Sequence, residues 1–275
     1  MRLMSSITSQ GAILQIPAPF PNCTYSIPFY GPSISCGPTP IGDTSFHEDV
    51  GKLINHYNTA GMIFYVGFVP KNLGGTGTAP SDLAPVGLNV TLGSPNDIVN
   101  PPFFDEESKD HARFYAATLK PGLNSNSRNN QTYETFECGL YNTSYVVDFT
   151  FNNGLQDIIV TNMTQLNGVY SGYELDQCGD WIPGTCGGPS KAYYSIMDAF
   201  SNQMIGYVEN SYYGHPIGVR TQLMNSVLME TTEIQQSMKA SYRQPLSIAN
   251  MTLAQAFEQT VLNATLSLFS DPYFL

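Results

Sequence analysis

The sequence contains few charged residues. Asp, Glu, Lys and Arg make up 12% of its 275 residues, about half the usual share of roughly 25% in soluble domains. Acidic residues outnumber basic ones by 22 to 11, giving a formal net charge of −11, and the basic residues form no run. This balance argues against nucleic acid as a partner, because a phosphate backbone is bound through clustered Lys and Arg. The apolar fraction of 42% argues against a disordered chain.

Long apolar runs are also missing. The most apolar stretch, residues 62–69, is eight residues long, whereas about 20 are needed to cross a bilayer. Residues 1–15 are too polar for a signal peptide, which needs an apolar core of roughly 7–15 residues. The sequence therefore predicts that any export signal and any membrane anchor lie outside this chain.

Asn-x-Ser/Thr triplets, the acceptor pattern for N-linked glycans, are by contrast frequent. About twice as many occur as the residue frequencies predict, and none has Pro at its centre. Glycans attached there would hydrate a surface that has few charges, so the pattern favours the secretory pathway and an extracytoplasmic location. The predicted sites are Asn22, Asn89, Asn130, Asn142, Asn162, Asn250 and Asn263.

The five cysteines contain two pairs that are close in sequence. An oxidising compartment would favour the short bridges Cys23–Cys36 and Cys178–Cys186, which leave Cys138 unpaired. A zinc site is disfavoured, because neither cysteine pair has the short spacing of zinc-binding cysteines, and no His follows at a spacing that would complete the ligand set. We expect disulfides here and no metal or other cofactor.

Catalytic motifs are hard to find. The chain has no Gly-x-Ser-x-Gly nucleophile elbow. The densest ionisable cluster, residues 105–111, contains Glu107 and Asp110, which could act as the two carboxylates of a hydrolase on wall polysaccharide. A solvated charged loop is the more ordinary interpretation, and we assign no catalytic residue.

Strand patterns dominate the first two-thirds. Residues 1–45 are rich in Pro, which restricts their apolar pieces to edge strands or loops. Met62–Val69 and Arg113–Leu119 are predicted strands. Alternation from Thr143 to Asn162 around Asn153-Gly154 predicts a hairpin with a type I′ turn. In that register Phe149 faces Ile158 and Val147 faces Val160, while Thr150 faces Asp157 and Asp148 faces Ile159.

Helical periodicity follows in the last third. Apolar spacing predicts helices over Ser190–Glu209, Val219–Glu230 and from Thr252, where Gln255 completes a capping box. Asn263 falls on the polar side of that last helix, beside Gln255 and Gln259, so we expect its triplet to be accessible. An earlier helix is predicted over Thr44–Asn55.

These patterns predict an α+β fold. An antiparallel sheet or sandwich would occupy the N-terminal two-thirds, with C-terminal helices packed on it. Residues 1–20 would be poorly ordered. Residues 21–275 would form one extracytoplasmic domain, β-rich over 21–165 and helix-rich over 189–270.

Several segments, in this order, resemble a family of fungal membrane proteins that are often labelled formylmethionine deformylase-like. At the start and centre they are Pro21-Asn-Cys-Thr-Tyr25, Gly31-Pro32 with Cys36, Cys138-Gly-Leu-Tyr-Asn-Thr-Ser-Tyr145 and Phe149-Thr-Phe-Asn-Asn-Gly154. Later segments are Met197-Asp-Ala-Phe200, Leu253-Ala-Gln-Ala-Phe-Glu258 and Asn263-Ala-Thr-Leu-Ser267.

The resemblance implies a glycosylated ectodomain that hydrophobic helices before and after this chain anchor to a membrane. It also carries the deformylase label, but that chemistry needs two His at i and i+4 with a Glu base. His47, His56, His111 and His215 contain no such pair. We therefore expect a non-catalytic ectodomain that acts in cell-surface recognition or organisation, with a carbohydrate or protein ligand. The alternative is the extracellular hydrolase.

Overall fold

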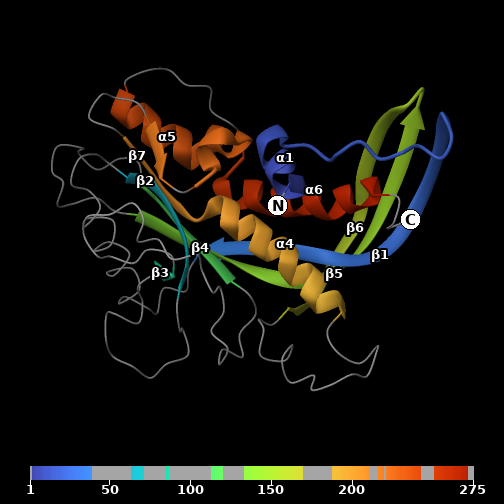
Figure 1. The fold of residues 1–275 in the computed structure, drawn as a ribbon, viewed down its shortest axis with the longest axis horizontal. Coiled ribbons are helices and arrows are strands. Elements are labelled where there is room, and N and C mark those ends of the chain that lie inside the picture. Colours follow the sequence, from blue (N-terminus) through green and yellow to red (C-terminus); the bar gives the residue numbers. More distant parts are fainter. Residues whose placement is uncertain are drawn as a thin grey trace.

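The structure is a computed structural model. It describes residues 2–38, 63–70, 85–86, 113–119, 133–169, 188–210, 216–219, 221–242 and 251–271. Its centre is an eight-stranded sheet in which every pairing is antiparallel, with the strand order β1-β5-β4-β2-β7-β8; β6 also pairs with β5, and β3 with β2. Helices pack on this sheet (Figure 1). The predicted α+β fold class is confirmed.

The elements have the following bounds. The strands are β1 Asn22–Pro38, β2 Ile63–Pro70, β3 Pro85–Val86, β4 Arg113–Leu119, β5 Tyr133–Asn152, β6 Leu155–Gly168, β7 Gly206–Asn210 and β8 Pro216–Val219. The α-helices are α1 Arg2–Gln10, α4 Gly188–Met204, α5 Thr232–Tyr242 and α6 Leu253–Ser267. Short 3₁₀ turns are η2 Leu223–Asn225, η3 Val227–Glu230 and η4 Leu268–Ser270.

The hairpin of β5 and β6 confirms the predicted register in full. Phe149 pairs with Ile158, Val147 with Val160, Thr150 with Asp157 and Asp148 with Ile159. Asn153 and Gly154 have φ values of 52° and 81°, the positive angles that a type I′ turn requires. The turn residues and the alternation therefore specified this element locally.

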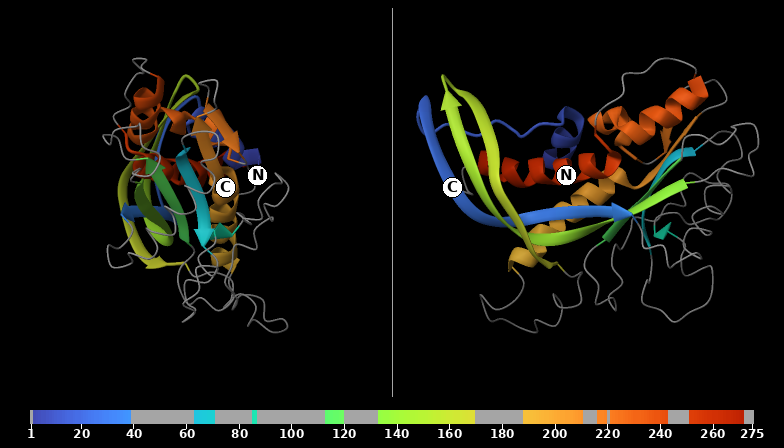
Figure 2. Two further views of the ribbon diagram at one scale, coloured as in Figure 1. Left: turned by 90° about the vertical axis from the view of Figure 1, so that its left-hand side faces the viewer. Right: turned by 180° about the vertical axis from the view of Figure 1, so that it is seen from behind.

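Strand β1 is an edge strand, as its prolines predict. Among the described strands it pairs only with β5, from Asn22 opposite Asn152 to Pro38 opposite Phe136. On the other side of β5, β6 shows register shifts at Asn142/Thr143 and Val146/Val147. Such bulges bend a strand and increase its twist. Figure 2 shows β1, β5 and β6 curving together around α6.

Two buried clusters form the core. In the first, α1, α4, α5 and α6 cover β2, β4, β7 and the adjoining ends of β1 and β5; we call this region the helix half. In the second, aromatic and aliphatic residues of β1, β5 and β6 pack against the C-terminal part of α6; we call this region the hairpin half. Helix α6 belongs to both and joins them.

Helix α6 begins as predicted. The Thr252 Oγ1 accepts a hydrogen bond from the Gln255 amide at 3.2 Å, and the Gln255 Oε1 accepts one from the Thr252 amide at 3.0 Å. This capping box satisfies two amides that the helix leaves unpaired. Phe257, one turn later, lies fully buried among the rings of Tyr65, Phe114 and Phe200, with centroid distances of 5.1 to 6.5 Å.

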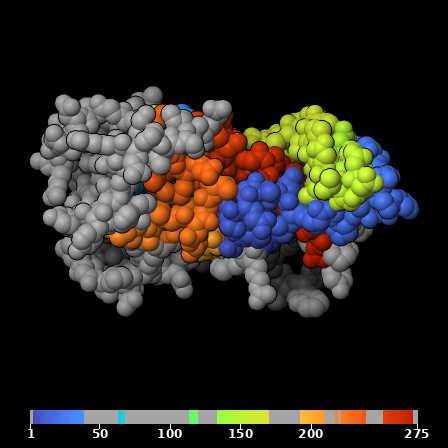
Figure 3. Space-filling view, turned by 90° about the horizontal axis from the view of Figure 1, so that it is seen from above, coloured from blue at the N-terminus to red at the C-terminus, as the bar shows by residue number. Residues whose placement is uncertain are grey.

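The prediction that residues 1–20 are poorly ordered is wrong. Residues Arg2–Gln10 form α1, whose Met4 and Ile7 are buried in the helix half. The segment after α1 crosses to the hairpin, where the Gln156 side chain accepts from the Ile16 amide and donates to the Leu14 carbonyl. Figure 3 shows this N-terminal part, in blue, between the orange helical region and the yellow-green hairpin. The amphipathic pattern of α1 is too short to be recognised in the sequence without knowledge of α6, the helix on which it packs.

Two predicted helices have the wrong extent. The one predicted over Ser190–Glu209 ends at Met204, and β7 begins at Gly206, whose φ of 123° only glycine adopts readily. The segment predicted as a helix over Val219–Glu230 contains the end of β8 and two 3₁₀ turns. Ser226 separates the turns, because its backbone is extended and its side chain accepts from the Leu228 amide.

Helix α5 was not predicted, and it follows at once, over Thr232–Tyr242. Its Ser237 hydroxyl donates to the Leu119 carbonyl at 3.0 Å, so it is attached to β4. The helix predicted over Thr44–Asn55 lies outside the described residues.

Candidate functional site

The disulfide pairing differs from the prediction. Cys36 is bonded to Cys138, 102 residues away in sequence, and Cys23 is a free thiol. The two bonded residues face each other in the register of β1 and β5. Cys23 and Cys36 were predicted to close a short loop, but they stand on one extended strand. At about 3.3 Å per residue, 13 steps separate them by roughly 43 Å.

The prediction that Cys138 is unpaired is therefore wrong as well. Cys178 and Cys186 lie outside the described residues, so their predicted bridge stays a prediction. A bonded Cys36–Cys138 pair fits an extracellular location, because cytosolic thiols are kept reduced.

The predicted glycan sites have unequal surroundings. Asn22 and Asn162 are exposed, at the start of β1 and within β6. Asn142 is half-buried on β5, and its Oδ1 has no hydrogen-bond partner. Asn89, Asn130 and Asn250 lie outside the described residues.

The expectation that the triplet at Asn263 is accessible is wrong. Asn263 is only 4% exposed, its Nδ2 donates to the Gly11 carbonyl at 3.1 Å, and its Oδ1 accepts from Gln259 at 2.8 Å. The helical wheel placed this residue correctly beside Gln259, but α1 covers that side of α6, and this contact could not be derived from the local sequence.

The residues proposed for a hydrolase, Glu107 and Asp110, lie outside the described residues. Within the part of the chain that the structure describes, no three His, Cys, Asp or Glu side chains are grouped so that they could hold a metal ion. No helix in that part has both the length and the apolar character required to cross a bilayer.

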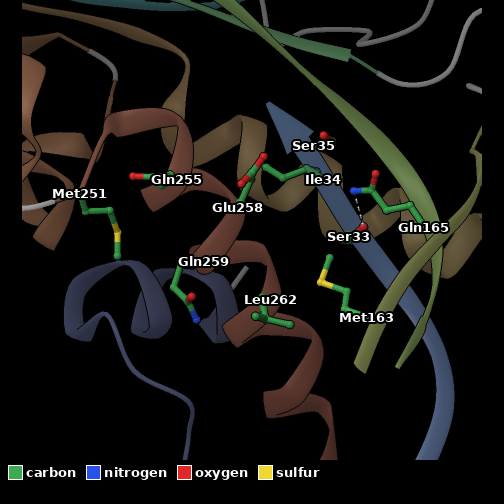
Figure 4. A pocket seen from close by; sticks show the side chains of 10 residues that line it. All are labelled: Ser33, Ile34, Ser35, Met163, Gln165, Met251, Gln255, Glu258, Gln259 and Leu262. Atoms are coloured by element: carbon green, nitrogen blue, oxygen red, sulfur yellow. Dashed lines mark hydrogen bonds between the residues drawn. The ribbon is translucent and has the colours of Figure 1, made fainter. Parts of the chain in front are cut away.

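A groove of about 630 Å³ lies between α6 and the strands β1 and β6. Figure 4 shows the α6 side chains on one side of it and the strand side chains on the other. Two methionines, Met163 and Met251, lie at its margins and are each 41% exposed. The lining residues are Ser33, Ile34, Ser35, Met163, Gln165, Met251, Gln255, Glu258, Gln259 and Leu262.

Hydrogen bonds fix the walls of this groove. The Glu258 Oε1 accepts from the Cys36 amide at 2.7 Å, which ties α6 to β1 beside the disulfide. On the strand side, Ser33 and Thr143 share a hydrogen bond of 2.6 Å between their hydroxyls, and the Gln165 Nε2 donates to the Ser33 Oγ at 3.4 Å. These contacts join α6 to β1 beside the groove and fix the polar side chains of its strand wall.

Several polar groups in the groove keep hydrogen-bonding capacity for a ligand. The Glu258 carboxylate uses one of its two oxygens for Cys36. The side-chain Oε1 of Gln255 is used in the capping box, which leaves its Nε2 for a ligand. The side-chain Nε2 of Gln259 donates to Asn263, which leaves its Oε1. Among the described lining residues Glu258 is the one that carries a charge.

The groove can therefore bind a neutral hydrophilic molecule through amides, hydroxyls and one carboxylate. A general acid and base pair would require a second carboxylate. None of the site residues predicted from the sequence is among the described residues that line this groove, although the Cys36 amide donates to Glu258, which does line it. The polar side of α6, with Gln255 and Gln259, was visible in the periodicity, but the strands opposite it were not.

No family model, curated protein or solved structure matches the chain.

Proposed function

We propose that this chain is a non-catalytic, glycosylated recognition domain outside the cytoplasm, which binds a neutral carbohydrate in the groove between α6 and β1. The single observation that carries the binding function is the groove itself, whose walls are fixed and whose amide and carboxylate groups keep free hydrogen-bonding capacity. A side-chain amide both donates to and accepts from hydroxyls, and an ionised carboxylate accepts from them, so neither group needs a ligand of opposite charge.

Apolar residues in the same groove support this choice of ligand. Ile34, Leu262 and Met163 lie among the polar groups, so the C–H faces of a sugar ring would have apolar surface to contact. A strongly charged ligand is disfavoured, because a single carboxylate is the charged group among the described lining residues.

The proposed location outside the cytoplasm is supported by three features. The Cys36–Cys138 bond fits an oxidising compartment, two acceptor asparagines, Asn22 and Asn162, are exposed, and the low charge favours a surface hydrated by sugars. The resemblance to fungal membrane proteins further implies that helices outside this chain attach the domain to a membrane. The role of the domain is then recognition or organisation at the fungal cell surface.

Calorimetry with soluble oligosaccharides tests the ligand. The chain, purified from a secretory host, is titrated with β-glucan, chitin and mannan oligosaccharides, and we expect saturable binding of at least one. Glu258→Gln keeps the oxygen that accepts from Cys36 but removes the charge, so its affinity should fall about tenfold, as for a hydrogen bond to a charged group. The control Asp157→Asn makes the same chemical change on β6, away from the groove, and should bind like the wild type.

The ligand assignment fails if none of the three oligosaccharides binds, or if Glu258→Gln binds as tightly as Asp157→Asn does. The location has its own test, peptide mass spectrometry after expression in a fungal host. We expect glycans at Asn22 and Asn162, none at Asn263, and a Cys36–Cys138 cross-linked peptide. Unmodified asparagines at both exposed sites together with reduced Cys36 and Cys138 would contradict it.

A further inference from the structure

A second pocket lies on a different part of the molecule from the groove. It has a volume of about 500 Å³ and is lined by residues of β1, α4, α6 and η4. Exposed residues at its edge, among them Tyr30, Ala192 and Ser195, open it to solvent. The lining residues are Phe29, Tyr30, Gly31, Pro32, Ala192, Tyr193, Ser195, Ile196, Thr265, Leu268 and Phe269.

The walls of this pocket are apolar and carry no charge among the described lining residues. Phe29 stacks on Tyr145 with a centroid distance of 5.1 Å and meets Phe269 edge-on at 4.8 Å. The Pro32 carbonyl accepts from the Thr265 hydroxyl at 2.8 Å and from the Tyr145 hydroxyl at 3.0 Å. The Pro32 carbonyl and the Thr265 and Tyr145 hydroxyls therefore satisfy one another and add no free polar group to the wall.

The pocket is a built feature of the α6–β1 contact. A Cβ at Gly31 would meet the Thr265 Cγ2 at 2.8 Å, so only glycine allows α6 to approach β1 this closely. The approach places Thr265, Leu268 and Phe269 of α6 and η4 on one side, opposite Ile196 of α4. A side chain at position 31 would push the two walls apart.

One polar group in the pocket has unused capacity. Tyr193 lines the pocket and is half-buried, and its hydroxyl makes no hydrogen bond to any described residue. Burial raises the pKa of Tyr193, so its hydroxyl stays protonated at physiological pH and can donate a hydrogen bond.

We infer that this pocket binds a small, neutral, largely apolar molecule with one hydroxyl or carbonyl group, in the class of sterols and long-chain alcohols. The apolar body would contact Phe29, Ile196 and Leu268, and the polar end would accept from or donate to Tyr193. Apolar cavities hold water poorly and bind hydrocarbons readily. Pockets for small ligands have volumes of roughly 300–1,000 Å³ and combine apolar walls with a few polar groups.

A second copy of the chain fits this pocket less well than a small molecule. Eleven of the described residues line it, whereas a stable protein interface uses about 20–30 residues from each partner. The described residues that line the recess come from a strand and from two helical segments. An ionic ligand would find no countercharge among the described lining residues.

Fluorescence of N-phenyl-1-naphthylamine, a neutral apolar probe, tests the proposal on the full chain. We expect saturable binding at one site and displacement by ergosterol or 1-dodecanol. Ile196→Trp and Ala192→Trp each fill part of the pocket, from its wall and from its edge, and should weaken probe binding at least tenfold. Gln259→Trp places the same side chain in the α6 groove and should leave probe binding unchanged.

Tyr193→Phe tests the polar end separately. It should weaken displacement by 1-dodecanol about fivefold, the usual contribution of one hydrogen bond, and leave displacement by dodecane unchanged.

The proposal is overturned if the wild type shows no saturable binding, or if folded Ala192→Trp and Ile196→Trp bind the probe like Gln259→Trp. A dimer in size-exclusion chromatography that Ala192→Trp dissociates would also overturn it, in favour of a second copy. These outcomes do not depend on whether the groove binds a carbohydrate.

Discussion

The hairpin half and the helix half of this protein are specified by interactions of different range. In the hairpin half, Asn153-Gly154 sets the turn and the alternation of apolar residues sets the register of β5 and β6, so residues no more than 27 positions apart decide this hairpin. In the helix half the decisive contacts join distant residues. Cys36 is bonded to Cys138, and Asn263 of α6 donates to Gly11 after α1. Local rules therefore hold for the β5–β6 hairpin, whereas long-range packing adds β1 and α6 to it and decides the helix half.

The largest expected effect follows from the disulfide. The double substitution Cys36→Ala with Cys138→Ala should lower the free energy of unfolding by about 4–5 kcal/mol, since the bridge closes a loop of 102 residues in the unfolded chain. Urea unfolding measures the loss. Cys23→Ala removes a free thiol and should change stability by less than about 1 kcal/mol. Equal stability of the double variant and the wild type would show that the helix half does not depend on this cross-link.

Truncation of one ring in the helix half should cost nearly as much. Phe257→Ala leaves a cavity among Phe200, Phe114 and Tyr65 and should lower the free energy of unfolding by about 3–5 kcal/mol. Leu155→Ala in the hairpin half removes a side chain that is 77% exposed, so its stability should stay close to that of the wild type. A small loss at Phe257 in the same urea experiments would mean that the helix half is loosely packed.

High pH should destabilise both halves. Burial raises the pKa of Tyr115 and of Tyr145 to about 12 and holds that of Tyr65 well above 10. Because the folded state keeps these protons to a higher pH than the unfolded state does, their contribution is complete below pH 10. It declines between pH 10 and 12 by about 1.4 kcal/mol per pH unit for each tyrosine.

Urea unfolding at pH 8, 10 and 11 measures this slope. Tyr145→Phe in the hairpin half and Tyr65→Phe in the helix half should each make stability less dependent on pH. Because the Tyr65 hydroxyl donates to the Met204 carbonyl at 2.8 Å, Tyr65→Phe should also lose about 1 kcal/mol at pH 8. An unchanged slope in both variants would rule out these tyrosines as the cause.

The smallest effect concerns the turn of the hairpin half. Gly154→Ala should cost about 1–2 kcal/mol, because its φ of 81° disfavours a Cβ although no heavy atom lies within 4 Å of one. Gly37→Ala provides the matched control, since a Cβ there has equal space and φ is not positive. Its stability should be unchanged or slightly higher. Equal effects of the two substitutions in thermal unfolding would show that the turn does not hold the register.

Predictions from the sequence were correct where the pattern was local and repeated. Arg113–Leu119 is a strand with the predicted bounds, and the capping box of Thr252 and Gln255 begins α6. They were wrong where a distant segment intervenes. Residues 1–20 contain α1 because the distant α6 offers it an apolar surface. The Val219–Glu230 periodicity yields 3₁₀ turns for a local reason instead, because Ser226 interrupts the helix.

The candidate groove and pocket could be predicted from the sequence even less well. Gln255, Glu258 and Gln259 share a side of α6 through helical spacing, which the sequence alone determines. That this side faces Ser33 and Gln165 depends on how β1, β5 and β6 curve around the helix.

The primary structure by itself determined the fold class, the hairpin register, the start of α6 and the scarcity of charge. Each depends on residues that are neighbours in the chain or on composition. The tertiary structure decided which cysteines bond, which asparagine is buried and where the two recesses lie. These depend on the packing of elements that are up to 253 residues apart, as in the hydrogen bond from the Leu14 amide to the Ser267 hydroxyl. Packing of this kind is set by the shapes of the completed elements, which no local pattern encodes.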